Sequence, residues 1–233
     1  MSYSLYQKIV YVLAVCVMSL MPLQASAGGI TLGGTRVIYP IGSKQVNISI
    51  RNTSQESHFL VQSWIENENE QKSSDFFITP PVYASAPGNE NILRLIKTVE
   101  PKHTDRETLY YLNTKAIPSI DKKKMEGKNM LVLAAVTRIK LFLRPAGLTP
   151  SVDKAPEELT FYLENNAVRI NNPTPYYITL AQIYIDGKPL PDAMVSPHDS
   201  LTLPAVAALR GNVSFRTIND YGAITPIKYT VLK

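Results

Sequence analysis

The stretch NMLVLAAVTRIKLFLRP, residues 129–145, has two unlike halves, and the interpretation of the whole chain depends on it. No side chain from Met130 to Val136 is polar, so both faces of an extended segment would be apolar. Cations then alternate with apolar residues, at Arg138, Lys140 and Arg144. A strand that is apolar on both faces is normally central in a covered sheet. Either this strand is buried within its own domain, or its second face needs a partner.

Residues 1–27 have the three parts of a secretory signal: the cation Lys8, an apolar run to about Met21, and Ala25-Ser26-Ala27 as the cleavage site. An uncleaved membrane anchor is the alternative, but the run is short for ~30 Å of hydrocarbon. We therefore expect an exported mature chain, not embedded in the membrane, that begins at Gly28. Cleavage removes Cys16, the only cysteine, so packing and not disulfides must stabilise the fold.

The composition is that of a globular protein, with 45% hydrophobic and 18% charged residues. The formal net charge of +5 is spread along the chain, apart from the run Lys122-Lys123-Lys124. For an exported chain, a solvated loop explains this run better than nucleic-acid binding does. We expect no nucleic acid among the partners.

Short runs rich in Val, Ile, Thr and Tyr recur between turn residues, and no amphipathic helical pattern of useful length is present. The runs before Pro145 have the number and spacing of an immunoglobulin-like sandwich. Pro145, Gly147 and Pro150 mark a linker, and Asp186-Gly187 indicates a tight hairpin in the second half. We therefore predict an all-β protein, with one domain at residues 28–146 and another at residues 147–233.

The sequence contains no recognisable catalytic constellation. His58, His103 and His198 lie far apart, without the spacing of metal ligands, and no nucleophile-elbow, zinc-protease or phosphate-loop motif occurs. Asp105 and Glu107 could suggest an acid pair, but solvated charges at a strand end are the favoured interpretation. We expect neither enzymatic activity nor a cofactor.

Five segments resemble the PapD-like periplasmic chaperones of pilus assembly, in the order in which that family has them. They are WIENEN (residues 64–69), DRETLYYLN (105–113), IKLFLRP (139–145), NPTPYYIT (172–179) and INDYG (218–222). The resemblance implies two immunoglobulin-like domains set at an angle, with a cleft between them. It also implies a periplasmic chaperone that caps pilin subunits and delivers them to an outer-membrane usher.

The resemblance assigns a role to both halves of the opening stretch. Leu131, Leu133 and Ala135 would enter the open groove of a pilin, and Ala135 is smaller than the residue the family usually has. Arg36, in GGTRVIYP, and Lys140 would anchor the carboxylate at the pilin C-terminus, although two surface cations remain the alternative. Strict alternation puts Lys140 opposite Leu131 and Leu133, so we expect a bulge, a bend or the strand's exit into the cleft.

Further implications concern the domain interface and the loop before this strand. Glu107, Arg144 and Asp220 would form an interdomain ion-pair network, with independent surface charges as the alternative. The loop at residues 119–128 is short, and the mature chain has no cysteine, which favours the subtype associated with rod-like pili. The competing hypotheses are a secreted two-domain sandwich with a structural, adhesive or sugar-binding role and, less favoured, a hydrolase.

Overall fold

The computed structural model describes residue 7 and residues 28–119, 131–165, 167–204 and 211–233. Almost all of the expected signal sequence lies outside the described residues, as do residues 120–130, which comprise most of the loop and the first two residues of the opening stretch. The regular structure in the described part is almost entirely β-strand, so the predicted all-β fold class is confirmed.

The first domain packs two sheets face to face. One sheet has the order β1-β3-β7-β5 and the other β2-β9-β8-β4-β6. The strands are β1 (Ile30–Leu32), β2 (Arg36–Pro40), β3 (Val46–Asn52), β4 (Phe59–Asn67), β5 (Phe76–Thr79), β6 (Val82–Ser85), β7 (Glu90–Lys97), β8 (Thr108–Pro118) and β9 (Ala135–Arg144).

Alternating apolar residues on the inner faces of the two sheets form the first core, with Tyr39, Leu93, Leu112 and Leu141 fully buried.

The second domain has the same construction on a smaller scale. Its sheets have the orders β10-β11-β15 and β13-β12-β16-β17, with β14 also paired to β12. Its elements are the 3₁₀ turn η1 (Ala155–Glu158), β10 (Thr160–Glu164), β11 (Ala167–Asn172), β12 (Ile178–Ile185), β13 (Lys188–Leu190), β14 (Ala193–Val195), β15 (Asp199–Pro204), β16 (Asn212–Thr217) and β17 (Lys228–Val231).

Asp186 and Gly187 both have positive φ in the β12–β13 hairpin, which confirms the predicted tight turn.

The first strand of the chain changes sheets, and this change creates an unusual edge. β1 pairs antiparallel with β3, whereas β2 crosses to the other sheet and pairs parallel with β9. Gly33 lies at the crossing, where an added Cβ would overlap the Ser49 hydroxyl, so the backbones approach closely. The crossing puts Arg36, the first residue of β2, directly beside Lys140 of β9.

The strand expected over the opening stretch is shorter than the apolar pattern suggested. β9 begins at Ala135, and residues 131–134 have no regular structure. Its pairing with β8 runs from Ala135 to Leu143 without a register shift. No bulge therefore separates Ala135 from Lys140, and the two side chains point to opposite faces by simple alternation.

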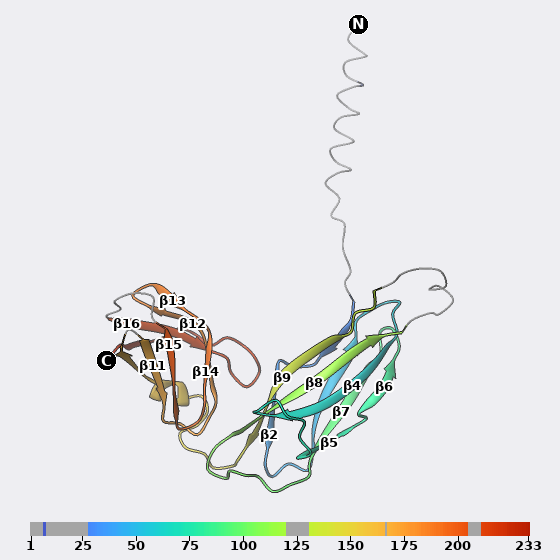
Figure 1. The fold of residues 1–233 in the computed structure, drawn as a ribbon, viewed down its shortest axis with the longest axis horizontal. Helices are drawn as coiled ribbons and strands as arrows, with labels where there is room; N and C mark the ends of the chain where they lie inside the picture. The colour runs from blue at the N-terminus through green and yellow to red at the C-terminus, as the bar shows by residue number, and fades with distance from the viewer. Residues whose placement is uncertain (1–6, 8–27, 120–130, 166, 205–210) are drawn as a thin grey trace.

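The two domains form separate bodies that meet at one end, with β2 and β9 on the side of the first domain nearest the second (Figure 1). Phe142 shows why this arrangement is stable. It points outward from its own sheet, yet it is only 2% exposed, because the Tyr177 ring of the second domain lies 5.7 Å away between centroids. Within the described residues, no helix has the length and apolar character needed to cross a membrane.

Candidate functional site: two cations at the end of an open strand edge

Arg36 and Lys140 are lateral neighbours on two parallel strands and point to the same outward face of the sheet. Both reach the second domain. The Arg36 Nη1 donates to the Ile218 carbonyl oxygen at 3.0 Å, and the Lys140 Nζ donates to the Thr179 hydroxyl at 3.4 Å. In the described part of the chain, no carboxylate lies within ion-pair distance of either cation.

Burial and mutual repulsion make this pair of charges costly. Burial lowers the pKa of Lys140, and the charge of Arg36 lowers it further. Burial also lowers the pKa of Arg36, although the charges of Asp220 and Glu107 partly oppose that effect. A carboxylate placed between two such cations would relieve the repulsion and accept charge-assisted hydrogen bonds. The electrostatics therefore favour an anionic ligand here.

The half of β9 that precedes Lys140 has an open edge. β2 pairs only with residues 140–144 of β9, so in the described part of the chain residues 135–139 are paired with β8 alone. An unpaired strand edge presents backbone N–H and C=O groups that can template another strand. The edge ends where Arg36 begins β2.

Apolar side chains accompany this open edge. Leu131 is 82% exposed and Leu133 is 73% exposed, and both lie in the segment that leads into β9. Their positions have the same parity as Ile139, Leu141 and Leu143, which are buried in the first core. An extended segment would therefore continue the inner face of the sheet beyond the end of its own core.

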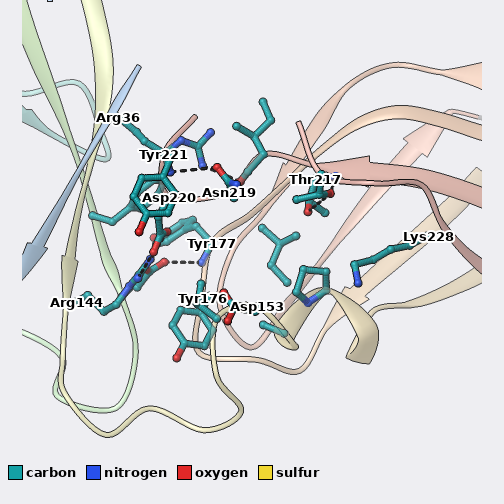
Figure 2. A pocket seen from close by; sticks show the side chains of 18 of the residues that line it. Arg36, Arg144, Asp153, Tyr176, Tyr177, Thr217, Asn219, Asp220, Tyr221 and Lys228 are labelled. Carbon is teal, nitrogen blue, oxygen red and sulfur yellow. Dashed lines mark hydrogen bonds and ion pairs between the residues drawn. The ribbon is translucent and has the colours of Figure 1, made fainter. Parts of the chain in front are cut away.

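Arg144 and Asp220 meet at the domain junction (Figure 2), and Glu107 pairs with the same guanidinium. The Arg144 guanidinium donates from Nε to Glu107 at 2.6 Å, and from Nη1 and Nη2 to the two Asp220 oxygens at 2.6 and 2.7 Å. The other Glu107 oxygen accepts the backbone N–H of Tyr177 at 2.8 Å. A bidentate arginine between carboxylates of different domains restricts their relative orientation.

Glu107 corrects the expectation of a solvated charge, because it is only 2% exposed. Burial raises its pKa, although the charge of Arg144 opposes that shift. For Arg144, burial alone would lower the pKa, but the hydrogen bonds to Asp220 and the charge of Glu107 outweigh it and the pKa rises. Asp105 remains exposed, as expected, and pairs with its neighbour Arg106.

The family is identified by two matches that together cover most of the chain. Residues 29–149 match the family model "Pili and flagellar-assembly chaperone, PapD N-terminal domain", and residues 154–229 match "Pili assembly chaperone PapD, C-terminal domain". The chain belongs to the PapD family of pilus-assembly chaperones. The resemblance seen in the sequence segments is therefore confirmed.

Individual PapD-family proteins are similar over nearly their whole length. The probable fimbrial chaperone SfmC of Escherichia coli K12 is 43% identical over 203 residues, which is 87% of this chain and 88% of SfmC. FimC of the same strain is 41% identical over 210 residues, which is 90% of this chain and 87% of FimC.

Among solved structures, the periplasmic chaperone SfaE matches with a TM-score of 0.77 and 39% identity, covering 88% of this chain and all of SfaE. SafB of Salmonella enterica, in a complex with the pilin SafA, has a TM-score of 0.80 and 28% identity, and the match covers 89% of this chain and 98% of SafB. These matches favour the chaperone hypothesis over an adhesive or sugar-binding sandwich.

Sequence reasoning did not find the groups of the second domain that contact the two cations. The Ile218 carbonyl and the Thr179 hydroxyl belong to motifs that were recognised, but neither group was assigned a contact. A cavity of about 520 Å³ also lies at the junction, with Arg36, Arg144, Tyr177 and Tyr221 among its lining residues (Figure 2). The described residues contain no cluster of three or more metal-ligating side chains.

Proposed function

We propose that this PapD-family chain is a periplasmic chaperone that lends the open edge of β9 to a pilin subunit, caps it and delivers it to an outer-membrane usher. The observation that supports this most strongly is the open edge of residues 135–139, which ends at two adjacent cations without a carboxylate partner in the described residues. The pilin complex of the related SafB supports a pilin as the partner.

The geometry favours one direction for the added strand. A strand that pairs with residues 135–139 on the open side would lie end to end with β2. If it runs parallel to β9, its last residue meets Arg36, and its terminal carboxylate faces two cations. An antiparallel strand would place a terminal ammonium there, or continue past it, and would gain no such attraction. We infer that the pilin strand is parallel and that its C-terminus is anchored by Arg36 and Lys140.

The apolar side chains beside this edge would supply much of the binding free energy. Burying Leu131 and Leu133 in a pilin groove would contribute ~1.5–3 kcal/mol each. Each backbone hydrogen bond of the added strand would contribute about 0.5–1.5 kcal/mol net. Ala135 offers less area, so its pocket would be shallower. The mechanism uses binding energy alone and needs neither catalysis nor a cofactor.

Anchoring the pilin C-terminus would also fix the register. A slip of one residue would turn the apolar side of an added strand away from the groove. If two cations hold the terminal carboxylate, the pilin strand can end at only one position along β9. The same pilin side chains then always face Leu131 and Leu133.

The capture of a pilin tests the proposal directly. The chaperone would be co-expressed with a candidate pilin encoded by a neighbouring gene, and the complex recovered from the periplasm. We expect wild type to retain the pilin and the double variant Arg36→Ala, Lys140→Ala to lose it while keeping its β circular dichroism. Equal recovery by the double variant would reject the anchor.

The periplasmic location has its own test. N-terminal sequencing of the exported protein should begin at Gly28, and titration of its free thiols should read zero, because Cys16 is removed with the signal. A full-length product in the membrane fraction would contradict export.

A further inference from the structure

The second domain contacts Arg36 through one turn, residues 218–222, between β16 and β17. We propose that this turn is the positioning device of the carboxylate anchor, and that Gly222 is the residue on which its fit depends. This inference rests on the proposed function, because it concerns how the anchor recognises the end of a pilin. Positioning here means holding the guanidinium of Arg36, not contacting the pilin.

The Ile218 carbonyl selects which donors of Arg36 remain available. It accepts from Nη1, while the Nε is buried and has no hydrogen-bond partner among the described residues. Because Nη1 is held by the carbonyl and Nε is buried, Nη2 is the guanidinium nitrogen left to donate charge-assisted hydrogen bonds to a carboxylate. Holding Nη1 on the carbonyl therefore fixes the plane of the guanidinium and the direction in which Nη2 points.

The carbonyl itself is held in place from two sides. The Ile218 N–H donates to the backbone oxygen of Thr179 at 3.1 Å, and the hydroxyl of the same threonine accepts from Lys140. Further along the turn, the Asp220 carboxylate accepts hydrogen bonds from both terminal nitrogens of Arg144. The turn is thus fixed to the second domain at its start and to the first domain at Asp220.

The Asn219 side chain gives the turn its shape. Its amide oxygen accepts from the backbone N–H groups of Tyr221 and Ala223 at 3.1 and 3.0 Å. The Gly222 N–H closes the turn on the Asn219 carbonyl at 2.9 Å. Hydrogen bonds from backbone N–H groups to a nearby side-chain oxygen restrict the conformation of a turn more than hydrogen bonds to water would.

Gly222 lets the turn lie directly against the residue before Arg36. Its φ is +80°, and an added Cβ would overlap the hydroxyl oxygen of Thr35, while the Thr35 Cβ would lie 3.4 Å away. Threonine is restricted at χ1, so the overlap is relieved only if Thr35 adopts the one rotamer that turns both its branches away or if the turn moves. A methyl group at position 222 should therefore separate the turn from the start of β2 and draw the Ile218 carbonyl away from Arg36.

The test compares two ligands that differ only at the chain end. The probe is a synthetic acetylated peptide of alternating valine and serine, made with either a free C-terminal carboxylate or a C-terminal amide. The measured quantity is the ratio of the two dissociation constants. We expect wild type to favour the carboxylate by at least about tenfold, and Gly222→Ala to lower this ratio several-fold, with Lys140 keeping part of the preference, while binding of the amide peptide is unchanged.

Two further variants separate a steric effect from backbone strain. Gly187→Ala is the matched control, because Gly187 also has a positive φ, of +75°, but an added Cβ meets nothing within 4 Å. It should keep the wild-type ratio. Adding Thr35→Ala to Gly222→Ala removes the overlapping oxygen and should restore most of the carboxylate preference. An equal loss in Gly187→Ala, or no rescue by Thr35→Ala, would overturn the inference.

The outcomes distinguish this inference from the proposed function. If wild type binds both peptides equally, the carboxylate anchor itself fails. If wild type prefers the carboxylate and folded Gly222→Ala does so equally, only the positioning role fails. Should Gly222→Ala not fold, Asn219→Ala takes its place, because it loosens the turn without adding bulk. It should lower the ratio several-fold, and an unchanged ratio would refute the role of the turn.

Discussion

Residues 135–139 and residues 140–144 belong to one unbroken strand, but among the described residues only the second half has a strand on each side. In the second half, Leu141 and Leu143 are buried in the first core, while Phe142 and Arg144 face outward and contact the second domain. In the first half Ile139 is still buried, but Val136, and Leu131 and Leu133 in the segment before it, are apolar side chains that remain exposed. Neighbours, not composition, decide which part is core and which is available for binding.

The largest effect should come from placing the same charge in each of the two regions. Leu141→Glu would bury an unpaired carboxylate in the first core, at a cost of several kcal/mol, and should unfold the first domain. Leu133→Glu changes an exposed residue of the same parity, so the free chaperone should keep its melting temperature and lose pilin binding. Circular dichroism melts and pilin capture measure the two outcomes. Unfolding by Leu133→Glu would show that this leucine belongs to the core.

The next effect concerns the outward-facing end of the second half. Arg144→Ala would leave Glu107 buried without its cation, which typically costs about 3–5 kcal/mol, and would free Asp220. We expect the domains to splay, so that small-angle scattering gives a larger radius of gyration while the β circular dichroism signal persists. Glu107→Gln should cost less, because burial already disfavours the charge of that carboxylate. An unchanged scattering profile for Arg144→Ala would mean that the linker and apolar contacts set the angle.

A smaller effect should distinguish two cations on the outward face, one in each half. Arg138 already has Glu66 and Glu70 as partners at 3.5 and 3.1 Å, whereas Lys140 has no carboxylate partner in the described residues. Lys140→Met should therefore weaken pilin binding by about 1.5–3 kcal/mol, the value of a hydrogen bond to a charged group. Arg138→Met should change it by less than about 1 kcal/mol. Titration calorimetry measures both, and equal losses would argue for a general electrostatic attraction.

The sequence predicted the strands well wherever local alternation and burial agree, as in β3 and β9. It did not predict where β9 begins, because that depends on the partner: pairing stops at Ala116 of β8, close to Pro118, which has no N–H to donate. The short edge strand β6 was also missed, since it follows two prolines and, in the part of the chain that the structure describes, pairs only with β4.

For the site, charged side chains could be assigned from the sequence, but contacts made by backbone atoms could not. Arg36, Lys140 and Arg144 are charges in otherwise apolar strands, and the family resemblance assigned their roles, so their positions could be proposed before the structure. The carbonyl of Ile218 could not, because a backbone oxygen has the same chemistry at every residue and only the fold selects one. Only the family resemblance indicated that Glu107 lies at the domain interface, because its burial depends on a domain that begins far along the chain.

The smallest effect we expect is a pH-dependent difference in stability at Lys140. Burial and the charge of Arg36 lower the pKa of Lys140 in the folded chain from 10.5. Near neutral pH, the charged form of Lys140 is therefore less stable in the folded state than in the unfolded state. Lys140→Gln should therefore be slightly more stable than wild type at pH 7, by less than about 1 kcal/mol because the side chain is only half-buried.

As the pH rises through the lowered pKa towards 10.5, the folded state releases this proton before the unfolded state does. The unfolded state then binds more protons, and the contribution of Lys140 to stability becomes less unfavourable. The difference between wild type and Lys140→Gln should shrink over that window, since all other titrations cancel between the two proteins. Urea unfolding of both at pH 7 and at alkaline pH measures it. A difference that stays constant would mean that Lys140 is solvated, and that the second half of β9 carries no electrostatic strain for a carboxylate to relieve.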